Sequence, residues 1–166
     1  AVAVELERDA DHFAVTARAE LEADARTAWD TLTDYARLPE FIPGLTRTRV
    51  LSRHAAASAG VGAGERLTVE YQGRFAMLFM SLPTRLRLDV QHVPYTEIRA
   101  RSAPALPAGA EPPTLKSFRG RYRLTPVGIG EAAGPRLRLD YSAQFDLAEP
   151  LPPLIGALFG AAAMRR

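Results

Sequence analysis

The chain of 166 residues contains no cysteine. This absence excludes disulfide bonds, thiolate metal ligands and a cysteine nucleophile. Asparagine is also missing, so the chain has no acceptor for N-linked glycans. Lysine occurs once, at Lys116, and arginine carries almost all of the positive charge. The formal net charge is only +2. A balance this close to neutral lacks the basic excess typical of nucleic-acid-binding proteins, and we expect no DNA partner.

Long hydrophobic runs are absent as well. The longest apolar stretches, residues 75–82 and 151–164, are shorter than the roughly 20 residues that span a bilayer. We therefore expect no transmembrane segment and a soluble protein of the cytoplasm or the periplasm. The chain begins at Ala1 rather than at Met, which leaves open whether a targeting peptide was removed. Length and even composition predict a single domain over residues 1–166.

An amphipathic helix is predicted over residues 25–38. Asp24 stands where an N-cap residue would. Pro39 is expected to end the helix, because proline lacks the amide hydrogen and disfavours helical geometry in the residue before it. Three apolar residues recur at helical spacing and form one stripe, namely Trp29, Leu32 and Ala36.

Alternation of apolar and polar residues predicts strands over most of the remaining chain. Because one face of each run is polar, the strands should form an antiparallel sheet with one side in water. A glycine-rich loop ending in GVGAG is followed by a strand pattern instead of a helix, which favours a hairpin loop over a phosphate site. The first two alternating runs predict a hairpin before the helix. The runs occupy residues 2–6, 13–21, 46–53, 67–79, 86–92, 98–100, 118–124 and 137–145.

The end of the chain predicts a second helix, over residues 154–164. Such a helix needs an apolar surface to cover, and the concave face of the predicted sheet is the only large one left. Its apolar positions form one broad face and are Leu154, Ile155, Leu158, Phe159 and Ala162.

Several short motifs, in this order, resemble a known family. A helix ending in TDY is followed by PEFIPG, a strand ending in VLSR, SFRGRYRL at 117–124 and LRLDYSAQFDLAEPLPPLIG at 137–156. Together they resemble the polyketide cyclase/dehydrase and coenzyme-Q-binding branch of the START-like (SRPBCC) superfamily. The resemblance spans nearly the whole chain. It implies an α+β helix-grip fold, with a curved antiparallel sheet of about seven strands around a C-terminal helix and two short helices after the first strand. A ligand cavity is expected between sheet and C-terminal helix.

Strand parity predicts what lines that cavity. The strand arginines from Arg66 onward occupy the alternating positions that belong to the polar face of the sheet. We therefore expect none of their side chains to point into the cavity. The apolar tripeptide that follows the first helix is expected to border the cavity entrance. The predicted ligand-binding residues are Phe41, Ile42, Pro43, Val69, Tyr71, Phe75, Met77, Leu88, Val90, His92, Ile98, Phe118, Tyr122, Tyr141, Leu154 and Leu158.

The polar residues of this set have two interpretations each. The tyrosines either fill a sheet core or orient a ligand carbonyl or hydroxyl. His92 is either a general base at the pocket mouth or a half-exposed residue at a strand end without a role. Asp30 and Asp34 share a helix face, where carboxylates are usually solvated. No acid–base pair, catalytic residue, metal site or cofactor is predicted.

The arginines also allow two interpretations. Neighbouring strands place them side by side on the convex face, which forms either a basic surface for RNA or anionic lipid, or a solvated face of ion pairs. The small net charge favours the second interpretation. Acidic residues expected to pair there are Glu70, Asp89, Glu97 and Asp140.

Three functions remain open. The resemblance and the apolar cavity favour a non-catalytic protein that binds or carries a hydrophobic small molecule, such as a lipid, a quinone or a polyketide-like compound. The first alternative is a cyclase or dehydratase acting on such a molecule. The second is an interaction module that binds a ribosome or an anionic surface. The sequence does not determine the ligand, the oligomeric state or the compartment.

Overall fold

The computed structural model describes residues 2–9, 12–42, 44–54, 64–77, 80–103, 115–127 and 134–147. The C-terminal helix predicted over residues 154–164 lies outside these residues. In chain order the described elements are β1 (Val2–Asp9), β2 (His12–Leu21), α1 (Ala25–Thr33), the 3₁₀ helix η1 (Tyr35–Glu40), β3 (Leu45–His54), β4 (Arg66–Met77), β5 (Met80–Val93), β6 (Glu97–Ser102), β7 (Leu115–Pro126) and β8 (Leu137–Leu147).

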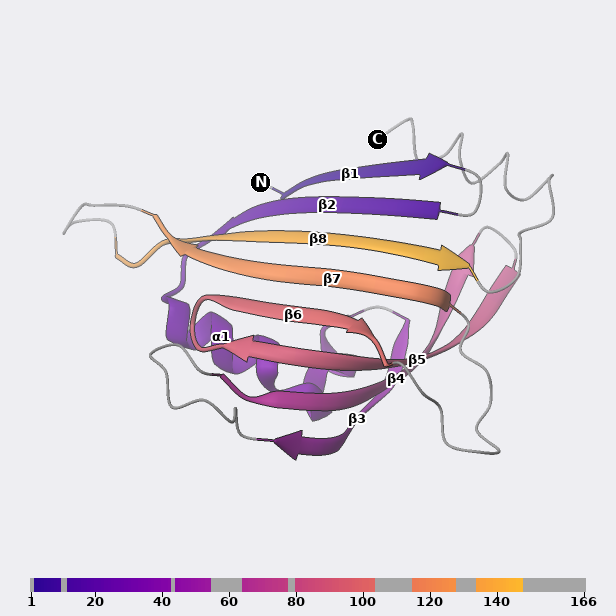
Figure 1. Ribbon diagram of the computed structural model, residues 1–166. Helices are drawn as coiled ribbons and strands as arrows, with labels where there is room; N and C mark the ends of the chain where they lie inside the picture. Colours follow the sequence, from indigo (N-terminus) through magenta and orange to yellow (C-terminus); the bar gives the residue numbers. More distant parts are fainter. Residues whose placement is uncertain are drawn as a thin grey trace.

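The strands form one antiparallel sheet in the order β1-β2-β8-β7-β6-β5-β4-β3 (Figure 1). The sequence predicts about seven strands, and the described sheet has eight. The hairpin that the first two alternating runs predict is confirmed, since β1 pairs with β2 along its whole length at the sheet edge, and it accounts for the eighth strand. That hairpin corrects a second expectation, since the two helical segments follow the second strand and not the first.

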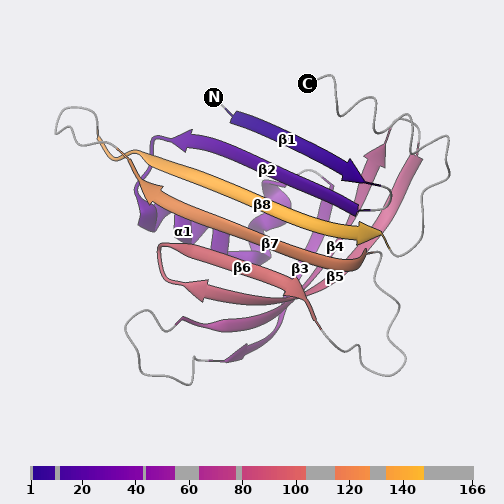
Figure 2. The same cartoon turned by 45° about the horizontal axis from the view of Figure 1, so that its top comes forward.

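Figure 2 shows the far ends of β4 and β5 turning out of the plane of their neighbours, so the sheet is curved.

The first helix is shorter than predicted. Its N-cap is confirmed, because the Asp24 carboxylate accepts a 2.7 Å hydrogen bond from the backbone amide of Thr27. The α-helix ends at Thr33, whose hydroxyl donates to the Trp29 carbonyl at 2.8 Å. Hydroxyl groups bonded back onto the preceding turn bend and weaken helices. The chain then continues as η1, which contains Pro39 instead of stopping before it.

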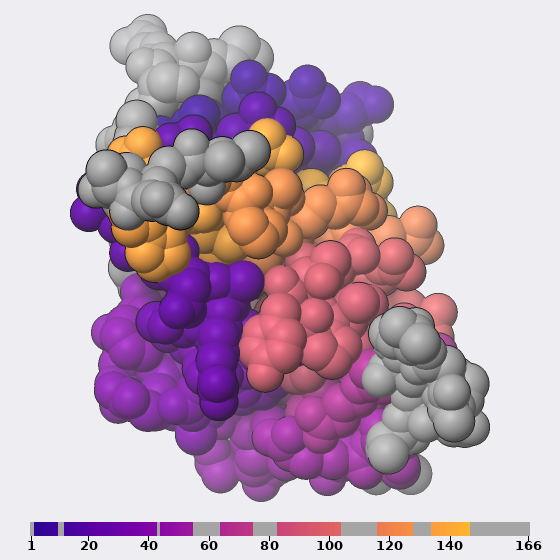
Figure 3. All heavy atoms as spheres, turned by 90° about the vertical axis from the view of Figure 1, so that its left-hand side faces the viewer, coloured from indigo at the N-terminus to yellow at the C-terminus, as the bar shows by residue number. Residues whose placement is uncertain are grey.

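The helical segment covers one face of the sheet, which we call the inner face. In Figure 1 α1 lies behind the strands, and in Figure 3 it lies against the turn that follows β5. At that turn the rings of Trp29 and Tyr95 are 5.9 Å apart. Ala36 is exposed, so the predicted apolar stripe does not continue past the end of α1. The helical residues Trp29, Tyr35 and Leu38 share one buried cluster with Leu67, Val69, Leu88, Val90 and Ile98 of the sheet.

Carboxylates on the outer face are held by arginines of the same strand and of neighbouring strands. Glu70 and Glu97 are only 5% and 6% exposed, so their charges need partners there. Asp89 instead accepts a hydrogen bond from the Thr68 hydroxyl at 3.3 Å. The ion pairs join Glu70 to Arg49 (3.5 Å) and Arg87 (3.1 Å), Glu97 to Arg99 (3.0 Å) and Arg121 (3.5 Å), and Asp140 to Arg18 (2.8 Å) and Arg138 (3.0 Å).

Two absences hold for the described part of the chain. None of its helices is both long enough and apolar enough to cross a bilayer. Within the same residues, His, Asp and Glu side chains do not gather in groups of three or more that could hold a metal ion.

A close backbone contact joins β4 to the residues before β3. Gly44 has a φ of 86°, a conformation that favours glycine, and its carbonyl accepts a 2.7 Å hydrogen bond from the amide of Arg74. A Cβ on Gly73 would overlap that same carbonyl. Position 73 therefore requires glycine, because the Gly44 carbonyl leaves no room for a side chain. The alternating pattern of β4 gives no sign of this restriction.

We expect Gly73→Ala to destabilise the protein by about 1–3 kcal/mol, because the backbone of Gly44 must shift to admit the methyl group. Urea unfolding followed by circular dichroism measures the change. Gly120→Ala is the matched control, since its added Cβ would come close only to the movable Phe118 ring, at 2.9 Å, and would meet the Ser142 carbonyl at an ordinary contact distance of 3.6 Å. Equal losses for the two variants would contradict this account of the contact.

Candidate functional site

A cavity of about 410 Å³ lies between the inner face of the sheet and the helical segment. Its volume is within the roughly 300–1,000 Å³ usual for small-molecule sites. The walls come from α1, η1, the residues after η1 and the strands β3 to β8. The described residues that line it are Leu32, Tyr35, Leu38, Ile42, Gly44, Leu45, Tyr71, Gln72, Gly73, Thr84, Leu86, Leu88, Val90, Ile98, Ala100, Phe118, Gly120, Arg121, Tyr122 and Tyr141.

Phenol groups supply most of the polar character of this lining. Tyr122 lies opposite Ile98 on one side and Tyr141 on the other, and the two tyrosine rings are 4.6 Å apart. Burial raises the pKa of Tyr71, and nearby Tyr35, Tyr122 and Tyr141 raise it further, so the four phenols stay neutral and lie within electrostatic reach of one another. The hydroxyls of Tyr71, Tyr122 and Tyr141 make no hydrogen bond to another described residue. They are therefore available to a ligand.

Charged groups are nearly absent from the described lining. Arg121 is the exception, but its guanidinium lies 3.5 Å from Glu97 on the outer face. Its backbone, next to Gly120, is therefore the part that reaches the cavity. The cavity wall is apolar except for the phenols, a few neutral polar groups and exposed backbone.

The structure brings together about half of the predicted ligand-binding residues. Phe41 does not line the cavity, because its side chain is 55% exposed and lies under the Arg37 guanidinium. Val69 is fully buried in the core behind the lining. Pro43, Leu154 and Leu158 lie outside the described residues, as do the side chains of Phe75 and Met77. The predicted residues that do line the cavity are Ile42, Tyr71, Leu88, Val90, Ile98, Phe118, Tyr122 and Tyr141.

Sequence reasoning missed the contribution of the helical segment. Leu32, Tyr35 and Leu38 line the cavity, although none of them is among the predicted ligand-binding residues. The apolar stripe was a usable signal for Leu32. Tyr35 had no such signal, because its direction depends on the change from α-helix to 3₁₀ helix after Thr33.

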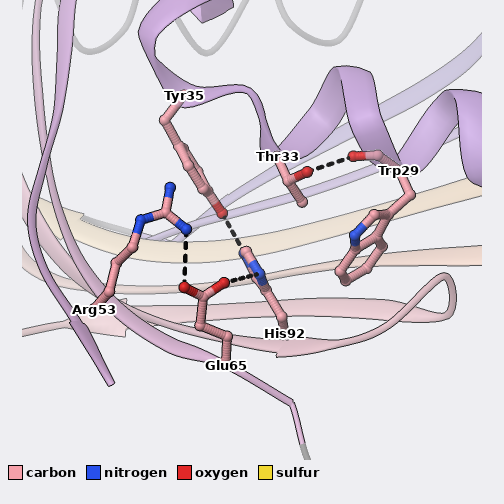
Figure 4. A network of polar contacts seen from close by, with 6 residues as sticks. All are labelled: Trp29, Thr33, Tyr35, Arg53, Glu65 and His92. Carbon is pink, nitrogen blue, oxygen red and sulfur yellow. Dashed lines mark hydrogen bonds and ion pairs between the residues drawn. The ribbon is translucent and has the colours of Figure 1, made fainter. Parts of the chain in front are cut away.

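A polar network with a buried centre adjoins the cavity at Tyr35 (Figure 4). The Tyr35 hydroxyl lies 2.7 Å from Nε2 of His92, and these residues are only 4% and 5% exposed. Nδ1 of His92 lies 3.8 Å from Oε2 of Glu65, whose other oxygen accepts a 2.8 Å hydrogen bond from Arg53. The Trp29 ring packs edge-on against the imidazole at 5.2 Å. We call Tyr35, His92, Glu65 and Arg53 the His92 network.

This network corrects two expectations about the inner face. His92 is not half-exposed and does not line the pocket mouth; it is buried behind Tyr35. The inner face also contains a set of acid–base groups, which strand parity did not predict. The residue types alone do not predict either correction, because both follow from where β3, Gly64 and Glu65 are placed.

A β-bulge turns Arg53 toward the network. Val50 pairs with Val69, but two residues later Ser52 pairs with Thr68, so Leu51 is an extra residue in β3. After the bulge Arg53 lies opposite the inward-facing Leu67. Simple alternation would have placed Arg53 on the outer face.

Gly64 lets the next part of the network approach. A Cβ at this position would overlap the backbone carbonyl of His92. The adjacent Glu65 accepts a 2.8 Å backbone hydrogen bond from the amide of His92 and carries its carboxylate to the imidazole. The last glycine of the GVGAG loop thus serves close backbone approach.

The sequence profile described as "Polyketide cyclase / dehydrase and lipid transport" matches residues 21–166. The chain belongs to this family. Members of the family, which is part of the START/SRPBCC superfamily, bind hydrophobic ligands. No curated protein sequence matches the chain.

Solved structures share the fold at low sequence identity. A START superfamily protein from Mycobacterium smegmatis is 17% identical with a TM-score of 0.56, over 91% of this chain and 89% of that one. The Zhui aromatase/cyclase from Streptomyces sp. R1128 is 14% identical with a TM-score of 0.58, over 93% and 86%. A STAR-related lipid transfer protein from Xanthomonas axonopodis is 13% identical with a TM-score of 0.53, over 99% and 91%. These likenesses concern the fold.

In this member of the cyclase/dehydrase and lipid-transport family, burial favours the neutral forms of the His92 imidazole and the Tyr35 phenol, the two groups at the centre of the His92 network. Desolvation lowers the pKa of His92 more than the Glu65 carboxylate raises it, and Arg53 lowers it further. Burial also raises the pKa of Tyr35 above its usual range. Because Glu65 faces Nδ1, we assign the proton of the neutral imidazole to Nδ1, so that the Tyr35 hydroxyl donates to Nε2.

The lowered pKa of His92 predicts a loss of stability in mild acid. The unfolded chain takes up the imidazole proton near the ordinary pKa of 6.5, and the folded chain does so only at lower pH. The free energy of unfolding should therefore fall as pH drops below that value, until the pKa of the folded state is passed. His92→Gln should remove this contribution, because glutamine accepts from Tyr35 but does not titrate. Thermal unfolding of both proteins from about pH 8 to about pH 5 measures the difference. Parallel curves for the two proteins would show that His92 does not contribute.

Proposed function

We propose that this protein binds a hydrophobic small molecule, such as a lipid, a quinone or a polyketide-like compound, in the inner cavity without transforming it. The observation that carries this proposal is the lining, which is apolar apart from neutral phenols and a few uncharged groups. Such a wall gains affinity from burial of apolar surface, at roughly 25 cal/mol per Å² removed from water. It offers little to stabilise charge that develops during a reaction, usually the largest catalytic contribution.

The tyrosines supply orientation within this apolar site. Tyr71, Tyr122 and Tyr141 present hydroxyls without a described protein partner, and each can donate to or accept from one oxygen of a ligand. A molecule with one oxygenated end and a long apolar body fits this distribution. The family relationship and its hydrophobic ligands support the same class of molecule.

Native mass spectrometry of the purified protein tests the proposal directly. We expect an apolar compound to remain bound after mild desolvation and to be released by organic extraction. A protein that neither carries such a compound nor takes up a fluorescent fatty acid or a quinone analogue would argue against this function.

Leu88→Arg should abolish uptake of the fluorescent fatty acid, because it places an unpaired charge in the cavity wall. Tyr122→Phe should only weaken uptake, by about 0.5–1.5 kcal/mol for one lost hydrogen bond. Leu51→Arg is the matched control, since Leu51 is 38% exposed and lies outside the described lining. Titration by fluorescence measures all three, with circular dichroism to verify folding. Unchanged binding by a folded Leu88→Arg variant would exclude this cavity as the site.

A second candidate function is that of a cyclase or dehydratase, and the His92 network favours it. Tyr35 lines the cavity and donates to a buried imidazole that is backed by a carboxylate. In such a reaction the Tyr35 oxygen would take a proton from a substrate carbon while its own proton moves to Nε2 of His92. Glu65 would stabilise the imidazolium that results.

Single variants distinguish the two functions. If the protein is a catalyst, Tyr35→Phe and His92→Gln should each lower turnover of a poly-β-ketone substrate by about 10²–10⁴-fold, whereas Tyr122→Phe should change mainly the KM. If the protein is a carrier, the wild-type chain should bind the compound and return it unchanged. Mass spectrometry of the extracted compound decides between these outcomes.

A further inference from the structure

A second hollow, of about 700 Å³, lies on the outer face of the sheet. Two rows of side chains run across the strands and form its walls. Arg66, Arg99 and Arg121 stand in one row, and Arg101 and Arg119 stand in the other. The residues between the rows face the core, so strand backbone forms the floor. We call this feature the arginine trough.

The pairing register brings like charges together in the trough. Arg99 lies directly opposite Arg121 on the neighbouring strand, and Arg101 lies directly opposite Arg119. Like charges in such positions destabilise a sheet. The guanidinium groups of these four arginines repel one another and destabilise the sheet locally. A bound anion would reduce this repulsion.

The protein neutralises only half of this block. Glu97 binds Arg99 through both carboxylate oxygens and lies 3.5 Å from Arg121. Among the described residues, Arg101 and Arg119 have no ion-pair partner. Asp89, which is opposite Arg101, is hydrogen-bonded to Thr68 instead. Two cations thus face the hollow without an ion pair to a described residue, and Asp89 is the one carboxylate of the described lining.

The shape of the trough favours an extended chain. Its rows are two residues apart along each strand, a separation of roughly 7 Å, and they cross the sheet for roughly 30 Å from β2 to β3. This channel admits one extended strand but not a duplex. Gln91 stands between Arg66 and Arg99, and the neutral donors Thr16, Ser142 and Gln144 continue the two rows beyond the arginines. Such groups suit phosphate oxygens.

We propose that the arginine trough binds the phosphodiester backbone of a single-stranded nucleic acid. Arginine binds phosphate through paired hydrogen bonds, and the spacing of the rows presents several such groups along one path. The described lining has no Phe, Tyr or Trp on which bases could stack, so the affinity rests on phosphate contacts, which carry no sequence information. The small net charge of the whole chain is compatible with this site, because Asp89 is the only carboxylate in the described lining, against five arginines.

Fluorescence anisotropy with labelled oligo(U) and oligo(dT) of about 12 nucleotides tests the proposal. We expect binding at about 50 mM salt that weakens steeply toward about 200 mM. The double variant Arg101→Gln/Arg119→Gln should bind at least about tenfold more weakly, and its salt slope should be smaller by about 2. The variant Arg101→Lys/Arg119→Lys should keep most of the slope. Comparison of the two oligonucleotides distinguishes RNA from DNA as the source of the backbone.

Arg47→Gln/Arg74→Gln is the matched control, because it removes the same charge from exposed positions outside the trough. This control should bind like the wild-type chain, and circular dichroism verifies the fold of every variant. Three outcomes would each overturn the proposal. They are no binding by the wild-type protein at low salt, equal losses in the control and the trough variants, and full competition by poly-glutamate, which would assign the trough to an acidic protein.

Discussion

The hydrogen bond between Tyr35 and His92 joins the helical layer to the sheet, and the cavity depends on it. It requires α1 to end at Thr33, so that η1 can turn the phenol toward β5. The bond is buried, so its loss would leave a polar group without a partner in an apolar environment. Where Trp29 packs against the imidazole, the same contact also positions α1. One polar contact inside an apolar core thus sets the direction of a whole segment.

The two faces of the sheet carry opposite chemistry because a strand alternates its side chains. The inner face buries hydrocarbon and phenols, and the outer face collects arginines and their acidic partners. The antiparallel register then decides which outer charges meet. Glu70 lies between Arg49 and Arg87, whereas Arg101 meets Arg119. Stabilising and destabilising arrangements therefore occur on one surface, within a few strands of each other.

Within its family the chain combines features of a carrier and of a catalyst. An apolar wall with neutral hydroxyls is suited to binding, and a phenol backed by imidazole and carboxylate is suited to proton transfer. Both use Tyr35, which contacts the cavity on one side and His92 on the other. The fold itself does not discriminate between them, because the same scaffold supports lipid transfer proteins and aromatase/cyclases.

The sequence by itself determined where the described strands lie, where the first helix begins and which faces most strand residues take. Alternation located the strands and placed the arginines from Arg66 onward outside, since side-chain parity is a local property of the backbone. Asp24 marked the start of α1, because N-capping is also a local interaction, here with the amide three residues later. Tertiary structure alone decided the site. The bulge at Leu51 reversed the parity of Arg53, and Gly64 was needed for contact with a distant carbonyl. The pairing of Arg101 with Arg119 joins residues far apart in the chain. Each of these depends on which segments meet, and no local pattern contains that information.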